Sequence, residues 1–331
     1  MPGPKNTIKE VALKAGVSIA TVSRFFSRPE ALKERNRKKV EQAVKELNYQ
    51  PLIYARKLAG GRLGAFGLIM PGYEGIFYSY YAIEIIRSTA FALDKMGLDL
   101  HLHIYWHRDN FKSSLVDGVI FADIIGNESQ LKRLIKDGIP AVVINHRFDD
   151  SGINSVSVDN TKGALEAVEF LINHRHKRIA HLAGDSRVQC SQDRLDGYKL
   201  ALAKHGIPVK DEYIKTTNFS RKEARDRLEE LFTLKDPPTA IFCCSDEVAG
   251  EVLSFCEEKK ITVPREVSVI GFDDNPYGTY GHLTLTTVRQ PLRLMASTAA
   301  EVLRDQLDNK GPVRKVVLNA ELIIRDTVAF L

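Results

Sequence analysis

The 331-residue chain has only four cysteines and no long uninterrupted apolar run. A membrane-spanning helix needs about 18 or more apolar residues in succession, so none is expected. The N-terminal MPGPKNTIKEV also lacks the apolar stretch of a secretory signal peptide. Cys190, Cys243, Cys244 and Cys256 form no C-x-x-C pair and have no histidines at zinc-site spacing. We therefore expect a cytoplasmic protein with reduced, buried thiols, no bound metal and no membrane contact.

The motifs of common enzyme classes are also missing. The sequence has no G-x-x-x-x-G-K-[ST], G-x-G-x-x-G, G-x-S-x-G or H-E-x-x-H string. Gly60, Gly61 and Gly64 do not follow a predicted strand, so they do not form a phosphate-binding loop. We expect neither enzymatic activity nor a cofactor.

Charge divides the chain into a basic head and a mildly acidic body. Residues 1–63 hold 14 Lys and Arg against 5 Asp and Glu, a net charge of +9, which leaves −4 on the remaining residues of a +5 chain. This asymmetry favours a nucleic-acid-binding module joined to a second unit. A solvated basic tail is the alternative, but it does not explain the helical patterning of the head.

The head opens with TIKEVALKAGVSIATVSRFF, the pattern of two short helices joined by a tight turn. Ile8, Val11, Ala12 and Ala15 form one apolar helix face. Gly16 supplies the left-handed residue that commonly ends a helix. A small residue and a glycine at the crossing of two helices are typical of a helix-turn-helix.

Ser18 is a good N-cap for the second helix, which turns Val22, Phe25 and Phe26 inward. Its outward residues are Ile19, Ala20, Ser23 and Arg24. This arrangement predicts a helix that reads a DNA groove. An ordinary αα-hairpin in another kind of core is the alternative.

A third helix is predicted from Glu34 to Leu47, with Asn48 as its left-handed exit. The next string, NYQPLIYARKLAGGR, predicts a short helical segment that is too short to be stable alone. Its Leu58 lies beside Arg56 and Lys57, as an apolar wedge for the minor groove would. A plain interdomain linker is the alternative.

The body alternates predicted strands with predicted helices, which indicates a doubly wound α/β architecture with two parallel-sheet subdomains. The expected strands are 65–70, 98–105, 118–122, 141–145, 179–183, 240–244 and 267–271. The expected helices are 81–96, 161–174, 194–204, 221–231, 246–259 and 292–307.

In this order, head, hinge and body closely resemble the LacI family of bacterial transcription regulators over nearly the full length. The strings that carry the resemblance are TIKEVALKAGVSIATVSR, LNYQPLIYARKLAGG, GLIMPG, DGVIF, SVSVDNTKGALEAVEFL, HKRIAHLAG, QDRLDGYKLAL, TAIFCCSDEVAG, VPREVSVIGFDDNP and LTTVRQP. The body alone also fits a periplasmic sugar-binding protein, but the head argues against that reading.

The resemblance implies a helix-turn-helix DNA-binding domain (1–48), a hinge helix and linker (49–63), and an effector-binding and dimerisation domain (64–331) of periplasmic-binding-protein type. The N-subdomain is expected at about 64–159 and 287–292, and the C-subdomain at about 160–286 and 293–331. The implied protein is a homodimer that binds a pseudo-palindromic operator. A small effector, commonly a sugar or a purine, binds between the subdomains.

The resemblance assigns DNA contacts by position. Ile19 and Ala20 offer apolar contacts to bases, and Arg24 is suited to a guanine edge. The residues assigned to phosphates are Thr7, Ser18, Thr21, Ser23 and Tyr49, and those in the hinge are Ala55 and Leu58. Thr7 and Ser18 could equally act as helix caps.

The resemblance assigns nine residues to the effector, because sugar sites combine planar polar groups with an aromatic surface. They are Phe77, Tyr78, Asn145, Arg147, Arg194, Ser245, Asp246, Asp273 and Gln290. Structural roles compete with these assignments. Arg194 and Asp273 could form an ion pair, Ser245 and Asp246 could cap a helix, and Phe77 and Tyr78 could belong to the core.

The chain departs from the usual family pattern at several positions. Leu52 replaces the Asn that follows the hinge proline, Lys33 replaces a Ser cap, and Arg175 replaces a glycine that ends a helix. Residues 107–115 are too few for the family's helix and loops, so one edge of the N-subdomain is expected to be bare or re-formed.

Together these features predict a repressor of carbohydrate-utilisation genes that a sugar releases from DNA. A purine corepressor and a protein co-regulator bound on the N-subdomain are alternatives. A sugar-binding sensor without DNA function is a third. No leucine-rich helix follows LIIRDTVAFL, so we expect a dimer rather than a tetramer.

Overall fold

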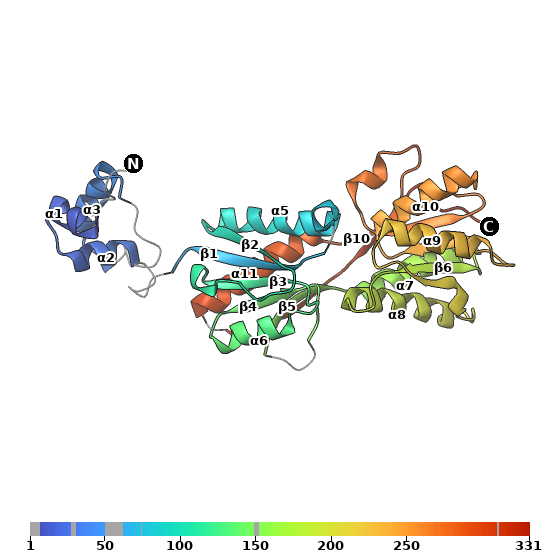
Figure 1. Ribbon diagram of the computed structural model, residues 1–331, viewed down its shortest axis with the longest axis horizontal. Helices are drawn as coiled ribbons and strands as arrows, with labels where there is room; N and C mark the ends of the chain where they lie inside the picture. The colour runs from blue at the N-terminus through green and yellow to red at the C-terminus, as the bar shows by residue number, and fades with distance from the viewer. Residues whose placement is uncertain (1–6, 28–30, 50–61, 74, 149–151, 310) are drawn as a thin grey trace.

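The computed structural model contains a small helical head and a larger α/β body (Figure 1). It describes residues 7–27, 31–49, 62–73, 75–148, 152–309 and 311–331. The predicted hinge helix, with Ala55 and Leu58, lies outside the described residues. No described helix is long and apolar enough to cross a membrane.

The head packs three helices around one small core. They are α1 (Ile8–Ala15), α2 (Ile19–Ser27) and α3 (Glu34–Glu46). Gly16 adopts a left-handed φ of 62°, and Asn48 follows α3 with a φ of 45°, which confirms both predicted helix exits. The buried core side chains are Val11, Ala12, Ala15, Val22, Val40, Ala43 and Tyr49. Lys33 makes no side-chain cap for α3, as its replacement of a serine predicted.

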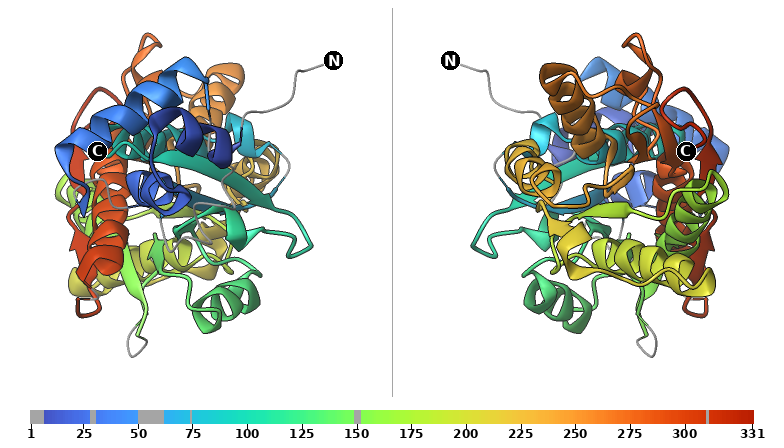
Figure 2. Two further views of the ribbon diagram at one scale, coloured as in Figure 1. Left: turned by 90° about the vertical axis from the view of Figure 1, so that its left-hand side faces the viewer. Right: turned by 90° about the vertical axis from the view of Figure 1, so that its right-hand side faces the viewer.

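The N-subdomain is built on a six-stranded parallel sheet in the order β11-β5-β4-β3-β1-β2. Its strands are β1 (Ala65–Pro71), β2 (Asp99–Tyr105), β3 (Gly118–Ala122), β4 (Ala141–Ile144), β5 (Asn154–Val158) and β11 (Lys315–Leu318). Helices α5 (Tyr80–Lys95) and α11 (Leu292–Asn309) pack on one face, and α6 (Glu128–Lys136) packs on the other (Figure 2).

The C-subdomain repeats this architecture with the sheet order β12-β10-β9-β8-β6-β7, in which only β12 is antiparallel. Its strands are β6 (Ile179–Ala183), β7 (Ile214–Thr216), β8 (Ala240–Cys243), β9 (Ser268–Asp273), β10 (Thr286–Arg289) and β12 (Glu321–Ile323). Helices α7 (Asn160–Asn173) and α8 (Gln189–Lys204) cover one face, and α9 (Arg221–Phe232) and α10 (Asp246–Lys259) cover the other.

The structure corrects the predicted division between the subdomains. We expected 287–292 in the N-subdomain and 293–331 in the C-subdomain. Strand β10 instead pairs with β9 in the C-subdomain, whereas α11 packs on β3, β4 and β5 and β11 pairs with β5 in the N-subdomain. The chain returns to the C-subdomain at β12. The prediction failed because β10 and β11 are only four residues long, and so short a strand does not show from its sequence which of the two sheets it joins.

The shortened segment 107–115 contains only the 3-10 turn η3 (Ser113–Leu115). Its Phe111 packs against His103 with ring centroids 5.3 Å apart, and it fills the space above Gly67. Trp106 covers Gly72 and remains half exposed. The Phe111 ring therefore re-forms the edge of the N-subdomain that the shortened segment was expected to leave bare.

The contact between α7 and α8 depends on a glycine, so Gly197→Ala tests it. A Cβ at Gly197 would lie 2.3 Å from the Thr161 carbonyl oxygen and 2.7 Å from the Ala164 Cβ. We expect the substitution to lower the free energy of unfolding by about 1–3 kcal/mol in chemical denaturation.

Gly250→Ala in α10 is the matched control, because nothing lies within 4 Å of its added Cβ. This variant should gain up to about 1 kcal/mol from helix propensity. Equal effects of the two substitutions would contradict the proposed tight packing of α7 on α8.

Candidate functional site

The side chains that we predicted to contact DNA bases lie on the exposed side of α2. Ile19 is 44% exposed, and Ala20 and Arg24 are also exposed. No described residue forms an ion pair with Arg24.

The polar residues assigned to phosphates have structural roles in the head. The Ser18 hydroxyl accepts a hydrogen bond from the Thr21 backbone N–H at 3.2 Å and lies 2.9 Å from the Thr21 hydroxyl. The Thr7 backbone N–H donates to a Glu10 carboxylate oxygen at 2.5 Å. These contacts confirm that Ser18 and Thr7 stabilise helix starts. Tyr49 is only 9% exposed because its ring packs near Phe26 in the head core.

In the body, polar side chains gather at the carboxyl ends of the parallel strands, where open α/β sheets bind ligands. Asp123 follows β3 and Asn145 follows β4 in the N-subdomain. The Asn145 amide donates to both Asp123 oxygens, at 2.9 and 3.2 Å. Asp123, Asn145 and Asp273 have φ values of 71°, 60° and 131°. Such backbone strain is concentrated at functional sites.

The C-subdomain contributes Arg194 from α8, Asp273 from β9 and Gln290 from the segment after β10. All three side chains are buried. The Gln290 amide donates to Asp273 at 2.5 Å. Arg194 donates from Nε to the Asn160 side chain at 3.0 Å and from Nη1 to the Cys244 carbonyl, and it stacks on Phe272. Arg194 and Asp273 thus do not form the ion pair that was the structural alternative.

Ser245 and Asp246 serve the fold rather than an open site. The Ser245 hydroxyl accepts from the Val248 backbone N–H at 3.2 Å and so caps α10. Asp246 accepts from the Asn275 backbone N–H at 2.6 Å and from the Thr287 hydroxyl at 2.5 Å. Both Asp246 oxygens therefore already have partners, but these lie outside α10, so of the two residues only Ser245 acts as the helix cap.

Two sets of contacts join the subdomains directly. Arg147, which follows β4, forms an ion pair with Asp193 on α8 at 2.7 Å. The Arg147 backbone N–H and carbonyl both bond to the Gln189 side chain. The Tyr80 backbone N–H donates to Glu247 at 2.7 Å. Arg147 thus contributes to closing the two subdomains on each other.

Phe77 and Tyr78 do not line the buried part of this cleft. They lie in the 3-10 turn η2 (Ile76–Tyr78), where their side chains are 56% and 92% exposed. The structure places Tyr81 there instead, with its buried hydroxyl beside Asp123. Tyr73 also lies near carboxyl groups of both subdomains, but it is 45% exposed. Sequence reasoning missed Asp123, Tyr73 and Tyr81, although Asp123 directly follows a predicted strand.

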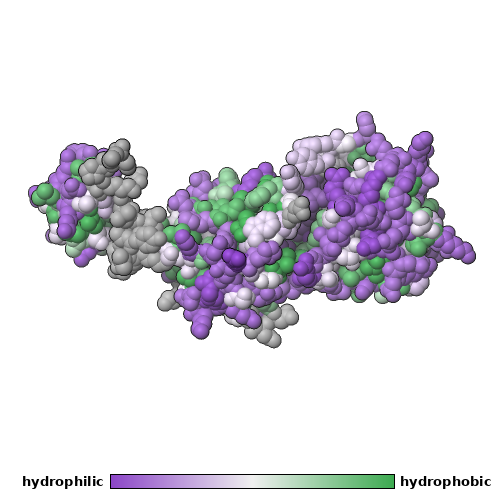
Figure 3. Space-filling view, viewed as in Figure 1, coloured by the Kyte–Doolittle hydropathy of each residue, from purple (hydrophilic) through white to green (hydrophobic). Residues whose placement is uncertain are grey.

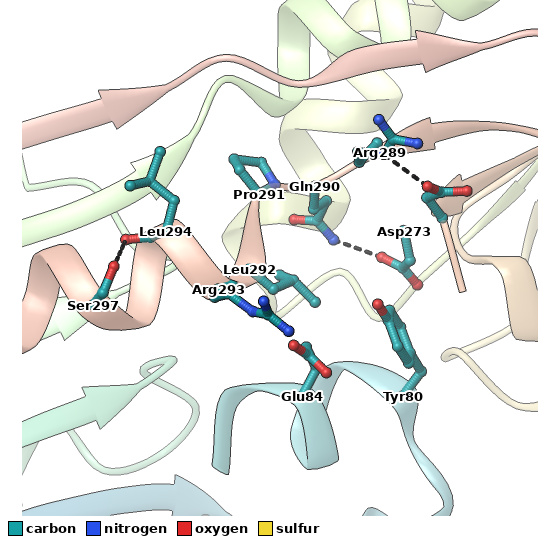
Figure 4. Close-up of a pocket in the computed structure, with 11 residues that line it drawn as sticks. Tyr80, Glu84, Asp273, Arg289, Gln290, Pro291, Leu292, Arg293, Leu294 and Ser297 are labelled. Atoms are coloured by element: carbon teal, nitrogen blue, oxygen red, sulfur yellow. Dashed lines mark hydrogen bonds and ion pairs between the residues drawn. The ribbon is translucent and has the colours of Figure 1, made fainter. Parts of the chain in front are cut away.

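A cavity of about 460 Å³ opens beside Asp273 and Gln290 (Figure 4). Its wall also includes Tyr80 and Glu84 from α5 and Arg293 at the start of α11. The Tyr80 ring points toward Asp273. The cavity connects the surface to the C-subdomain half of the polar cluster.

Burial controls the ionisation of this cluster. It raises the pKa of Asp123 from 3.8 to about 6, because the Asn145 hydrogen bonds, the neighbouring Tyr81 hydroxyl and the Arg194 charge only partly offset desolvation. Burial likewise raises the pKa of Asp273 well above its usual value. Each subdomain thus contributes one buried carboxyl group whose charge is poorly compensated, and Tyr73 and Cys190 lie near both groups, which is typical of a binding site.

Comparison with known proteins agrees with the two-part structure. Residues 7–51 match "Bacterial regulatory proteins, lacI family", and residues 168–328 match "Periplasmic binding protein-like domain". The chain is 31% identical to the probable HTH-type transcriptional repressor ExuR of Bacillus subtilis, over 97% of this chain and 98% of that protein. It is also 31% identical to catabolite control protein A of Priestia megaterium, over 92% and 93%.

The fold matches a solved structure described as the lac repressor dimer bound to operator and the anti-inducer ONPF. The TM-score is 0.85 at 24% identity, with coverage of 98% of this chain and 100% of that one. Head and body together define a DNA-binding transcription regulator. The chain belongs to the LacI family, and it is a transcriptional repressor rather than an enzyme.

Because no described cation pairs with Asp123, we predict that its ionisation lowers the free energy of unfolding as the pH rises. Its pKa is higher in the folded than in the unfolded chain, so its contribution is most favourable at low pH and is lost as the pH rises from about 4 to about 6. Asp123→Asn keeps an acceptor for Asn145 and should stabilise the ligand-free protein by about 2 kcal/mol at pH 7.5.

Thermal unfolding of both proteins between pH 4 and 8 measures this effect. The advantage of Asp123→Asn should grow up to about pH 6 and then stay constant. A difference between the two proteins that does not change with pH would contradict the assignment.

Proposed function

We propose that the protein binds a pseudo-palindromic operator as a homodimer and represses carbohydrate-utilisation genes until a small sugar enters the cleft. Support comes from two buried carboxyl groups, Asp123 in the N-subdomain and Asp273 in the C-subdomain, neither of which forms an ion pair with a described residue. Hydroxyl groups of a sugar would supply donors to both. A purine corepressor and a protein co-regulator remain the alternatives to a sugar. Because its target is chromosomal DNA, the protein acts in the cytoplasm.

In this proposal the exposed face of α2 lies in the major groove. Ile19 and Ala20 contact bases through apolar groups, and Arg24 bonds a guanine edge. Thr7, Ser18, Thr21, Ser23 and Tyr49 position the head through phosphates, alongside their structural roles. Ala55 and Leu58 contact the minor groove from the hinge.

An apolar face on the N-subdomain supports the dimer. Ile83 and Phe91 lie two turns apart on α5 and are 42% and 52% exposed, and Leu102 on the edge strand β2 is 41% exposed. The space-filling view shows a hydrophobic area over α5 (Figure 3). Clustered exposed apolar side chains of this kind mark association surfaces. A second copy of the chain would cover them.

Sequence-specific reading by Arg24 is tested on an operator selected in vitro from random DNA. Arg24→Ala should weaken binding to that operator by about 1–3 kcal/mol and relax the preference at one base pair. Arg24→Lys is the matched control, because it keeps the charge but loses the two-pronged geometry. Equal losses on operator and random DNA would show that Arg24 contacts only phosphates.

The dimer face is tested by Ile83→Asp, which would place a carboxylate in an apolar interface. Sedimentation at micromolar concentration should show a dimer for the native protein and a monomer for this variant. Leu200→Asp on α8 is the control, since Leu200 is 50% exposed but lies on the C-subdomain. A dimer that survives Ile83→Asp, or a stable native tetramer, would overturn the proposed association.

A further inference from the structure

We infer that the effector is a cationic amino sugar and that the cleft rejects acidic sugars. This inference rests on the proposed function, because it specifies the ligand of the same cleft. It follows from the balance of charges and of hydrogen-bond donors and acceptors among the described cleft residues.

The described cleft residues carry more negative than positive charge. Asp123, Asp193, Glu247 and Asp273 are the carboxyl groups, and Arg147 and Arg194 are the cations. Arg147 is already paired with Asp193. Arg194 is the cation whose charge acts on both Asp123 and Asp273, whereas Arg221 lies near Glu247 and Arg293 lies in the cavity wall beside Glu84. Asp246 lies behind Asp273 and adds further negative charge.

Arg194 does not neutralise either buried carboxyl group directly. Its Nε–H is used by Asn160, an Nη1–H is used by the Cys244 carbonyl, and its guanidinium plane lies 3.8 Å from the centre of the Phe272 ring. No described lysine or arginine lies within 4.0 Å of a carboxylate oxygen of Asp123 or Asp273. The partners described for these two groups are neutral amides, from Asn145 and Gln290.

The same amides leave acceptors without partners. Because the Asn145 and Gln290 nitrogens donate to Asp123 and Asp273, their oxygens Oδ1 and Oε1 point elsewhere. Both oxygens are buried and make no described hydrogen bond. A buried acceptor without a donor is unfavourable unless a ligand supplies one. One such acceptor lies on each subdomain, so a ligand that satisfies both must span the cleft.

These requirements distinguish three kinds of sugar. A carboxylate or phosphate group adds negative charge and further acceptors, so the cleft repels it. A neutral sugar supplies one donor from each hydroxyl. An ammonium group supplies three donors and a positive charge at a site of low effective dielectric constant, where charge pairing is strong. An amino sugar therefore fits the described groups best, with its ammonium beside Asp123.

The test uses matched sugars at pH 7 with the full-length protein. Isothermal titration measures binding of glucosamine, glucose, N-acetylglucosamine and glucuronate, and of the corresponding galacto and manno series. The N-acetyl compounds keep the nitrogen but remove the charge. In the series that binds, we expect the amino sugar to bind at least about tenfold more tightly than its neutral and N-acetyl partners. The uronate should bind at least about tenfold more weakly than the neutral sugar.

Asp123→Asn should reduce the preference for the amino sugar to less than about threefold while leaving neutral-sugar binding measurable. Asp137→Asn is the matched control, because Asp137 is an exposed residue at the end of α6 in the same subdomain. It should leave the preference unchanged. Release of selected operator DNA by each sugar is recorded in parallel.

The outcomes separate the two proposals. If a neutral or acidic sugar binds as tightly as the amino sugar and releases the operator, the charge inference is wrong and the sugar-controlled repressor stands. If no sugar of any series binds while the operator still does, both the amino-sugar inference and the sugar effector are wrong. An amino-sugar preference that persists in Asp123→Asn would overturn the role of Asp123.

Discussion

The body of this repressor is constrained by three chain crossings between its subdomains. They follow β5, β10 and β11, and each sheet contains a strand from the C-terminal region of the chain. Each half is therefore built from segments that are discontinuous in the sequence. Two rigid halves joined at three nearby points have few motions left except opening and closing of the cleft. Contacts such as Arg147–Asp193 and Tyr80–Glu247 stabilise the closed arrangement.

The cleft is stabilised less well than the sheets on either side of it. Asp123, Asn145 and Asp273 combine positive φ angles with burial, and neither carboxyl group forms an ion pair with a described residue. Each feature costs free energy that the packed cores must offset. A ligand with complementary charge and donors recovers part of this cost only when both subdomains contact it. Binding is therefore coupled to closure by the same groups that destabilise the empty cleft.

Much of this architecture was predictable, because buried parallel strands and amphipathic helices leave clear periodic patterns. The head helices, Gly16, Asn48 and the long helices of the body were found in this way. Strand β5 was missed because its sequence, NSVSV, is largely polar although all five residues are buried. The side chain of Asn154, for example, forms hydrogen bonds with the Gln306 side chain and the Arg314 backbone. The cleft aromatics were predicted at Phe77 and Tyr78, whereas the structure has Tyr81 there. The sequence alone does not show which of several neighbouring aromatic residues is buried. Asp123 was missed because its distinguishing feature is that no described cation pairs with its carboxyl group in the folded chain. A local sequence pattern does not show this.

Helix α11 connects the cleft to the base of the head. It begins at Leu292, shortly after Gln290, whose side-chain amide donates a hydrogen bond to Asp273. At the other end of the helix, the Arg62 guanidinium donates to the Leu307 carbonyl at 3.1 Å and to the Asp308 carboxylate. Its 18 residues span about 27 Å. The backbone N–H groups of Leu63 and Gly64 are fixed to Asp117 at 2.8 and 2.7 Å, which anchors the chain that leaves the head. A shift of the crossing segment at Gln290 therefore moves one end of a rigid helix whose other end holds the linker to the DNA-binding domain.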